Sequence, residues 1–361
     1  MISLLRFPTI RDYSLVGPEA ARAIEAGLAN GEWYKSPIPR KRLKELMKRR
    51  DAPALRDTII WLGAIIILGA MGVLLWGTWW AVPVFAAYGV LYASAADSRW
   101  HECGHRTAFR TAWLNDAVYA LASFMMLRSP TAWRWSHVRH HSDTIIVGRD
   151  PEIAGMRPPQ MIIMALNMFG LVNVPHSLAT LARYAVGSLN DEELDYIPEM
   201  ERRRVQFEAV VILTIHFAAA LVALATWSAM PIVLIGGPNI YGIWFLFMVG
   251  NTQHLGLAED VLDHRLDART VDMNPLFRFL YWNMNYHVEH HMYPMVPYYA
   301  LPELHEEVKA DCPEPTPGVF AAWAEILPTL LRQLKDPTYF IKKELPPGAG
   351  RSPSQARKVR Q

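Results

Sequence analysis

Two pairs of long uncharged runs constrain the fold of this chain most strongly. The first pair covers residues 58–76 and 79–96, and the second covers residues 209–227 and 230–250. Each run approaches the roughly 20 residues that a helix needs to cross a hydrocarbon core about 30 Å thick. Only two residues separate the runs within each pair. Because backbone polar groups in lipid must be satisfied within the chain, the sequence predicts an all-α integral membrane protein with four spans in two helical hairpins.

The distribution of positive charge predicts how these hairpins are oriented. A basic run at residues 40–50 precedes the first span, Arg202–Arg204 precede the third, and neither hairpin turn contains Lys or Arg. Basic segments next to spans stay in the cytoplasm, so both termini are expected there. The run at residues 40–50 is typical of an anchor that touches anionic headgroups. No second basic or aromatic motif supports nucleic-acid binding.

The same features divide the chain into regions. We predict a cytoplasmic N-terminal segment (1–56, with a short helix at 18–29), a membrane domain (57–305), a cytoplasmic helical region (306–345) and a disordered basic tail (346–361). Two further apolar stretches, 117–127 and 161–175, are too short to span and are expected at the membrane interface.

Three histidine-rich motifs follow these apolar segments. They are HECGH (His101, His105), HVRHH (His137, His140, His141) and HVEHH (His287, His290, His291), and a lone His254 follows the fourth run. Residues at i, i+3 and i+4 lie on one face of a helix, so the imidazoles of a motif point into one volume. Nine of the thirteen histidines belong to this set. Incidental surface histidines are a poor account of such a repeated spacing, and the pattern predicts a metal site in a cytoplasmic helical cap.

The number of histidines indicates more than one ion. Neutral imidazole is a good ligand for iron, copper, zinc or nickel. One catalytic zinc needs about three protein ligands, so nine are too many for a single ion. Two ions with four or five imidazoles each use the set well. Only two cysteines occur, Cys103 and Cys312, so the chain has no disulfide framework and no CxxC motif. Cys103, between His101 and His105, is expected to point away from the ligand face.

The motifs HECGH, SHVRHH, NTQH and NYHVEHHMYPMVPYYALPELH, together with the paired spans, resemble the membrane fatty acid desaturase and hydroxylase superfamily over roughly residues 58–305. The resemblance implies two non-haem irons held almost wholly by histidine, with dioxygen as the co-substrate that removes hydrogen from an unactivated C–H bond. The implied ligands are His101, His105, His137, His140, His141, His254, His287, His290 and His291.

Other side chains near the motifs are candidates for orienting these ligands. Carboxylates that accept imidazole N–H groups fix the ring and its tautomer. The candidates are Glu102, Asp143, Asp150, Glu152 and Glu289, with solvated surface charge as the alternative for each. Asn251, three residues before His254, is a candidate ligand, direct or through water. Some members of the superfamily place an asparagine four residues before that histidine instead.

Electrons are expected to come from another protein. The chain has no haem-binding HPGG motif, no rubredoxin-like cysteine pairs and no GxGxxG fingerprint. The resemblance therefore implies a ferredoxin, a rubredoxin or a b-type cytochrome with its reductase. The basic segments at residues 40–50 and 202–204 are candidate docking patches for an acidic partner, or simply topology signals.

The leading hypothesis is an O2-dependent di-iron oxidoreductase in a cell membrane (the inner membrane of a bacterium) that desaturates or hydroxylates a fatty acyl or lipid substrate at the cytoplasmic side. The alternative keeps the metal site and changes the substrate to a small polar or methylated compound, as in the similar rhizopine oxygenase. The charged end of HVRHHSDTIIVGRDPEI motivates that alternative.

A membrane zinc hydrolase or a metal transporter is a third class of function. A hydrolase needs fewer ligands plus a carboxylate base, and a transporter would place polar groups within its spans. The runs here carry almost no ionisable groups.

Overall fold

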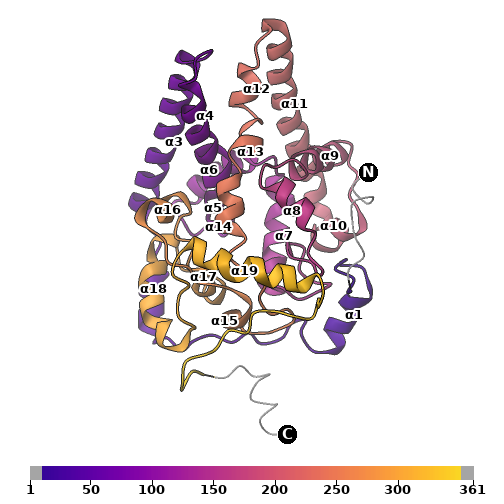
Figure 1. The fold of residues 1–361 in the computed structure, drawn as a ribbon, viewed down its shortest axis with the longest axis vertical. Helices are drawn as coiled ribbons and strands as arrows, with labels where there is room; N and C mark the ends of the chain where they lie inside the picture. Colours follow the sequence, from indigo (N-terminus) through magenta and orange to yellow (C-terminus); the bar gives the residue numbers. More distant parts are fainter. Residues whose placement is uncertain (1–9, 351–361) are drawn as a thin grey trace.

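A computed structural model describes residues 10–350, and these residues form an all-helical protein (Figure 1). Two isolated β-bridges, Thr270 with Tyr286 and Val271 with Thr316, are the only extended pairings within that range. The all-α class predicted from the sequence is therefore confirmed. Residues 351–361 of the predicted basic tail lie outside the described residues.

The helices follow one another with short connections. Those before the second histidine motif are α1 (Pro18–Glu25), α2 (Arg40–Leu46), α3 (Asp51–Leu74), α4 (Ala81–Gly89), the π-turn η2 (Val90–Ser94), α5 (Ala95–Gly104) and α6 (Ala112–Met125). The middle helices are α7 (Pro130–Ser142), α8 (Met161–Asn167), α9 (Asn173–Ala185), α10 (Asp191–Tyr196), η3 (Glu199–Glu201) and α11 (Arg202–Thr226). The remaining ones are α12 (Met230–Leu234), α13 (Pro238–Tyr241), α14 (Trp244–Gly250), α15 (His264–Asp267), α16 (Pro275–Leu280), α17 (His287–Met292), η4 (Tyr298–Ala300), α18 (Leu301–Val308), η5 (Lys309–Asp311) and α19 (Val319–Gln333).

Two helical stretches are long and apolar enough to cross a membrane. They are Arg40–Leu74, which ends in α3, and Glu199–Thr226, which contains α11. Large apolar side chains such as Ile66 on α3 and Phe217 on α11 are exposed. Such exposure is costly in water and suits contact with lipid. Both helices project from the same end of the molecule, at the top of Figure 1, beside α4 and α12.

The second predicted span begins as expected and runs further than its apolar residues. Helices α4 and α5, joined by the π-turn η2, form one continuous helical path from residue 81 to residue 104. The predicted span at 79–96 therefore leads without a break into His101. Single π-turns inside a helix often mark functional positions, and this one lies two turns before that histidine.

The fourth predicted span is not one continuous helix, and the expectation for residues 230–250 is wrong in this respect. The stretch is divided into α12, α13 and α14. Glycine and proline explain the first break, since Gly236 adopts a positive φ of 86° and Pro238 starts the next segment. Tyrosine hydroxyls satisfy carbonyls next to this break: Tyr88 donates to Leu234 O (2.9 Å), and Tyr241 donates to Val233 O (2.8 Å).

The second break lies where two backbones cross closely. A Cβ atom on Gly242 would lie 2.1 Å from the backbone of Gly89, so only glycine fits there. Ser94 in the π-turn donates to the Gly242 carbonyl at 2.6 Å, which ties α14 to the path that leads to His101. The broken segment therefore fixes the position of the following turn, which carries His254.

The opposite end of the molecule is made of shorter helices. In Figure 1, α1, α15, α17, α18 and α19 lie at the bottom, away from the projecting helices. The N-terminal segment packs against this end, because the Tyr34 and Ser36 hydroxyls both donate to Asp311 (2.7 and 2.6 Å). The histidine motifs on α5, α7 and α17 lie between the two ends.

Candidate metal centre

The nine predicted histidines converge from four separate parts of the chain into two groups. The five-histidine group contains His101, His105, His137, His141 and His290. The four-histidine group contains His140, His254, His287 and His291. Within each group, the ring nitrogens all lie within 4.8 Å of one another. Six of the nine side chains are buried, and His105, His141 and His254 are half-buried.

In the five-histidine group, the Nε2 atoms face one another. His137 Nε2 lies 3.3 Å from His101 Nε2, 3.2 Å from His105 Nε2 and 3.1 Å from His141 Nε2. His290 Nε2 lies 2.6 Å from His101 Nε2 and 3.2 Å from His141 Nε2. The group is therefore assembled from α5, α7 and α17.

The four-histidine group has the same character. His287 Nε2 lies 2.9 Å from His254 Nε2 and 3.0 Å from His291 Nε2. The His140 ring centroid lies 4.9 Å from that of His291 and 5.3 Å from that of His254. The turn after α14 supplies His254, so the break in the fourth apolar stretch contributes directly to this group.

The other ring nitrogens of several histidines are hydrogen-bonded. His140 Nδ1 donates to Asp150 (2.9 Å), and His137 Nδ1 donates to Glu152 (3.1 Å). His254 Nδ1 donates to the Asp267 carbonyl at 2.8 Å. When Nδ1 of a neutral ring donates, Nε2 keeps its lone pair. Lone pairs thus point into both groups.

Two predicted partners stand where the sequence placed them, and others do not. Asp150 and Glu152 contact imidazoles of the groups, as expected. Glu289 instead accepts hydrogen bonds from Thr270 (2.6 Å) and His305 (2.5 Å) and touches none of the nine imidazoles. The Asn251 amide donates to the Phe247 carbonyl at 2.9 Å.

The remaining two carboxylates and the cysteine have other surroundings. Asp143 pairs with Arg149 at 3.0 Å, and Glu102 accepts from the Tyr298 backbone N–H at 3.1 Å. Cys103 is buried and free, and burial raises its thiol pKa well above the usual value. A neutral, packed thiol agrees with the prediction that it points away from the ligands.

Burial keeps most of these imidazoles neutral. Desolvation, followed by the neighbouring histidines, lowers the pKa well below the ordinary value for His101, His105, His141, His287, His290 and His291. The same causes lower the pKa of His254 to about 3. Burial also lowers the pKa of His140, but the Asp150 carboxylate outweighs it and raises that pKa to about 9. Neutral imidazole is the form that binds metals.

Both groups fit a metal ion. Nitrogen ligands about 2.0–2.1 Å from one ion lie about 3.0–3.4 Å apart, close to the Nε2 separations of both groups. Without a cation, lone pairs held so close repel one another, and one N–H per neutral ring cannot bridge all of these contacts. Imidazole ligands suit iron, copper, zinc or nickel alike. The geometry therefore supports two cations, while the ligand role of the nine histidines stays a prediction.

Three features of the site were missed by sequence reasoning. Thr144 Oγ1 lies 3.2 Å from His291 Nδ1 and orients that ring. The Asp267 carbonyl that holds His254 is a backbone group, which no sequence motif reveals. His264 stacks on Trp33 with ring centroids 4.1 Å apart and lies beside His291. Its spacing gave no signal, because the contacts come from distant segments.

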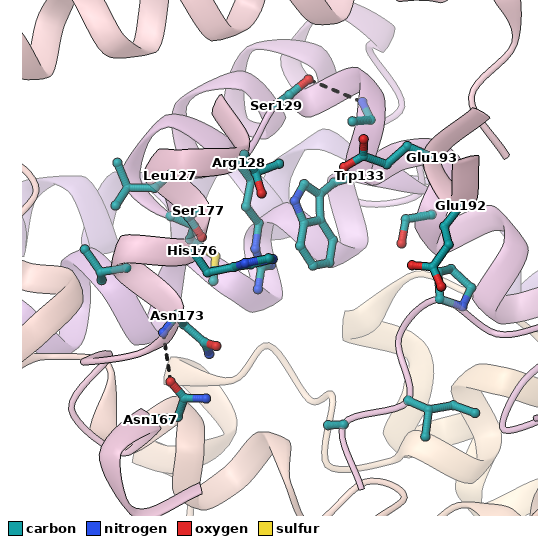
Figure 2. A pocket seen from close by; sticks show the side chains of 18 of the residues that line it. Leu127, Arg128, Ser129, Trp133, Asn167, Asn173, His176, Ser177, Glu192 and Glu193 are labelled. Carbon is teal, nitrogen blue, oxygen red and sulfur yellow. Dashed lines mark hydrogen bonds between the residues drawn. The ribbon is translucent and has the colours of Figure 1, made fainter. Parts of the chain in front are cut away.

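Two cavities adjoin the site. The larger, about 690 Å³, lies among the N-terminal residues 12–15, the start of α7, α9, α10 and α14. Figure 2 shows Arg128, Trp133 and His176 close together on one side of it and Glu192 on the other. The smaller, about 120 Å³, is lined by His140 and His254 of the four-histidine group.

An all-helical chain with membrane-length apolar helices and converging histidine groups defines a histidine-rich, membrane-associated class of protein. The chain belongs to the fatty acid desaturase family, whose profile matches residues 76–323. This membership confirms the resemblance read from the motifs and indicates an oxidoreductase associated with membranes.

Individual relatives are distant. The chain is 24% identical to the Delta(12) fatty acid desaturase FAD2 of Calendula officinalis over 297 residues, 74% of each protein. It is 24% identical over 236 residues to the Delta(9) fatty acid conjugase-like enzyme of Dimorphotheca sinuata, covering 58% of this chain and 63% of that enzyme. It is 29% identical over 101 residues to the sn-1 oleoyl-lipid 12-desaturase of Synechocystis sp., 28% of each. The match thus spans less than two thirds of the conjugase-like enzyme.

Proposed function

We propose that the protein is an O2-dependent di-iron oxidoreductase that desaturates or hydroxylates an unactivated C–H bond of a fatty acyl or lipid substrate. The single observation that carries this proposal is the convergence of nine imidazoles into groups of five and four. When bound, the two irons would supply the oxidising chemistry with dioxygen. The names of the relatives, desaturases and conjugases of fatty acids, support the acyl substrate.

The chain's own residues hold and shield this chemistry. Asp150 and Glu152 fix two rings so that their Nε2 atoms face inward. The buried apolar residues around α5, α7 and α17, such as Trp100 and Met292, exclude water from the site. Imidazole resists oxidation better than thiolate, and both cysteines are kept out of the two groups.

The membrane arrangement is part of the proposal. Four segments in two hairpins, with both termini and the histidines on the cytoplasmic side of a cell membrane, agree with the projecting α3, α4, α11 and α12 in Figure 1. The basic residues 40–50 and 202–204 lie where α3 and α11 approach the opposite end. This placement follows the excess of Lys and Arg on the cytoplasmic side of membrane proteins.

Reducing equivalents must come from a separate protein. We propose a ferredoxin, rubredoxin or b-type cytochrome with its reductase, because the sequence contains no haem, flavin or iron–sulfur motif. The basic residues at 40–50 are a candidate docking surface for such an acidic partner.

A second candidate keeps the same metal centre but oxidises a small polar or methylated compound. One observation favours it: about half of the residues that line the 690 Å³ cavity are polar or charged, such as Glu192 and Asn173. An acyl chain alone would leave those groups without partners, at a cost in binding free energy.

Metal analysis and product analysis test the proposal together. The purified protein should contain two irons per chain, and one zinc without iron would instead favour a hydrolase. Expression with a generic ferredoxin and reductase should then give an oxidised product by mass spectrometry. Oxygen uptake driven by acyl lipids or by small methylated compounds separates the two substrate classes, and uptake with neither would refute both.

A further inference from the structure

The 690 Å³ cavity beside the metal centre has the size of a small-molecule site. Its walls come from distant parts of the chain: residues 12–15, the start of α7, the loop 150–156, α9, α10 and α14. Polar side chains line it throughout, including Ser177 and Thr180 of α9. A site built only for an acyl chain would be lined mainly by apolar groups.

The charges in this cavity are unbalanced. Asp12, Asp150, Glu192 and Glu193 supply four carboxylates, while Arg128 and Arg183 supply two guanidinium groups. Both guanidinium groups are already paired, Arg183 with Glu193 at 2.7 Å and Arg128 with Asp97 at 2.9 Å. Asp150 is engaged with His140.

Two carboxylates remain without a cation. Neither Glu192 nor Asp12 forms an ion pair with any residue in the range 10–350. An anionic ligand would meet these carboxylates and find both guanidinium groups occupied. A cationic ligand would gain a counter-ion, so the cavity favours a positive charge.

Glu192 is held in place for this role. It is half-buried on α10, and its Oε1 accepts the Leu15 backbone N–H at 3.3 Å. The start of α10 is fixed by the reciprocal capping of Asn190 and Glu193. The rings of Tyr196 and Tyr184 line the same cavity, and aromatic faces attract ammonium groups.

The cavity continues toward the metal centre. It shares four lining residues, Ile153, Ala154, Gly250 and Asn251, with the 120 Å³ cavity that His140 and His254 line. A ligand held by its head near Glu192 can therefore direct its other end past this junction to the four-histidine group.

We propose that the larger cavity binds an ammonium group of the substrate, with Glu192 as the main counter-ion and Asp12 as a weaker one. The ammonium group belongs either to a lipid headgroup or to a free small compound. The oxidation that follows rests on the proposed function, but the binding does not.

Calorimetry on the metal-loaded protein tests the binding without turnover. The protein is placed in phosphatidylglycerol nanodiscs, without oxygen or reductant, and titrated with choline, with its neutral isostere 3,3-dimethylbutan-1-ol, and with butyrate. Choline should bind about tenfold more tightly than the neutral isostere, and butyrate should bind more weakly than both. Equal affinity for choline and the isostere, or tighter binding of butyrate, would overturn the proposal.

Variants assign the effect to this cavity. Glu192→Gln keeps the acceptor for Leu15 and removes the charge, so it should weaken choline binding about tenfold without affecting the neutral isostere. Asp12→Asn should weaken it by a smaller factor. Glu199→Gln, at an exposed glutamate outside the cavity, is the matched control and should change nothing. Unchanged choline affinity in both Glu192→Gln and the double variant would refute the assignment.

A second membrane composition identifies the source of the ammonium group. Replacing phosphatidylglycerol by phosphatidylcholine should reduce choline affinity severalfold if the lipid headgroup occupies the cavity. Unchanged affinity in phosphatidylcholine indicates a free compound. Either result supports the ammonium site, because both arms require choline to bind through Glu192. If binding holds while no ammonium compound is oxidised, the proposed function fails separately.

Discussion

The two histidine groups differ in ligand number and in how their rings are held. The five-histidine group offers one more imidazole than the four-histidine group. Three of the four rings in the smaller group have a bonded Nδ1, with Asp150, Thr144 and the Asp267 carbonyl as partners. In the larger group, the Nδ1 atoms of His141 and His290 have no hydrogen-bond partner among residues 10–350.

This contrast assigns different tasks to the two groups. Fewer ligands leave room for exogenous groups, and the four-histidine group also borders the 120 Å³ cavity through His140 and His254. Its rings are fixed from outside, so their orientation does not depend on a full set of ligands. The five-histidine group is held mainly by mutual contact around one centre. We infer that the substrate approaches the four-histidine group.

The largest expected effect comes from removing one ligand from each group. His291→Ala leaves three imidazoles in its group and should reduce the iron content from two to about one per chain. His290→Ala leaves four and should retain more of its ion. Both should lower turnover by about 100-fold or more, beyond the 10–100-fold typical of outer partners. His216→Ala, far from both groups, should keep two irons, and equal metal loss at positions 290 and 291 would contradict the contrast.

Smaller effects are expected from the two carboxylates. Asp150→Asn and Glu152→Gln should each weaken metal binding about 10–100-fold, measured by competition with a chelator. The Asp150 change should be the larger, because the same carboxyl group also accepts the backbone N–H groups of Ile145 and Glu152 (both 2.8 Å).

Glu289→Gln is the matched control for these carboxylates. The Glu289 side chain is fully buried among the same motifs but contacts Thr270 and His305 instead of the nine imidazoles. Its replacement should leave metal affinity unchanged. Loss of metal affinity comparable to that of Asp150→Asn would show that proximity, not the hydrogen bond to the ring, is what matters.

Sequence reasoning predicted which histidines assemble but not how they divide. His137 and His141, four residues apart, share one group, while His140 between them joins the other. The third motif repeats this division, with His287 and His291 together and His290 apart. Adjacent helical residues point about 100° apart, so His140 and His141 face different volumes. The single volume expected for each motif is thus two volumes.

The partners of the rings were predictable only in part. The direction of Glu289 could have been anticipated, because residues at i and i+2 do not share a helix face. Asp150 reaches His140 through the loop that follows α7, whose path depends on contacts such as the Val147 backbone N–H with Asp260. Such long-range contacts leave no local pattern. The helical class followed from apolar runs, but the break at Gly236 required a close look at glycine and proline.

The smallest expected effect tests whether the four-histidine group is the one that meets the substrate. Ala154 is exposed at the junction between the two cavities, so Ala154→Leu adds bulk in the passage without touching any imidazole. Turnover should fall severalfold, roughly the cost of one or two misplaced methylene groups, while the iron content stays at two per chain. Ala182→Leu, at an exposed alanine on α9 outside both cavities, controls for added bulk. If Ala154→Leu left both KM and kcat unchanged, the substrate would have to arrive by another route, and the larger cavity would lose its connection to the metal centre.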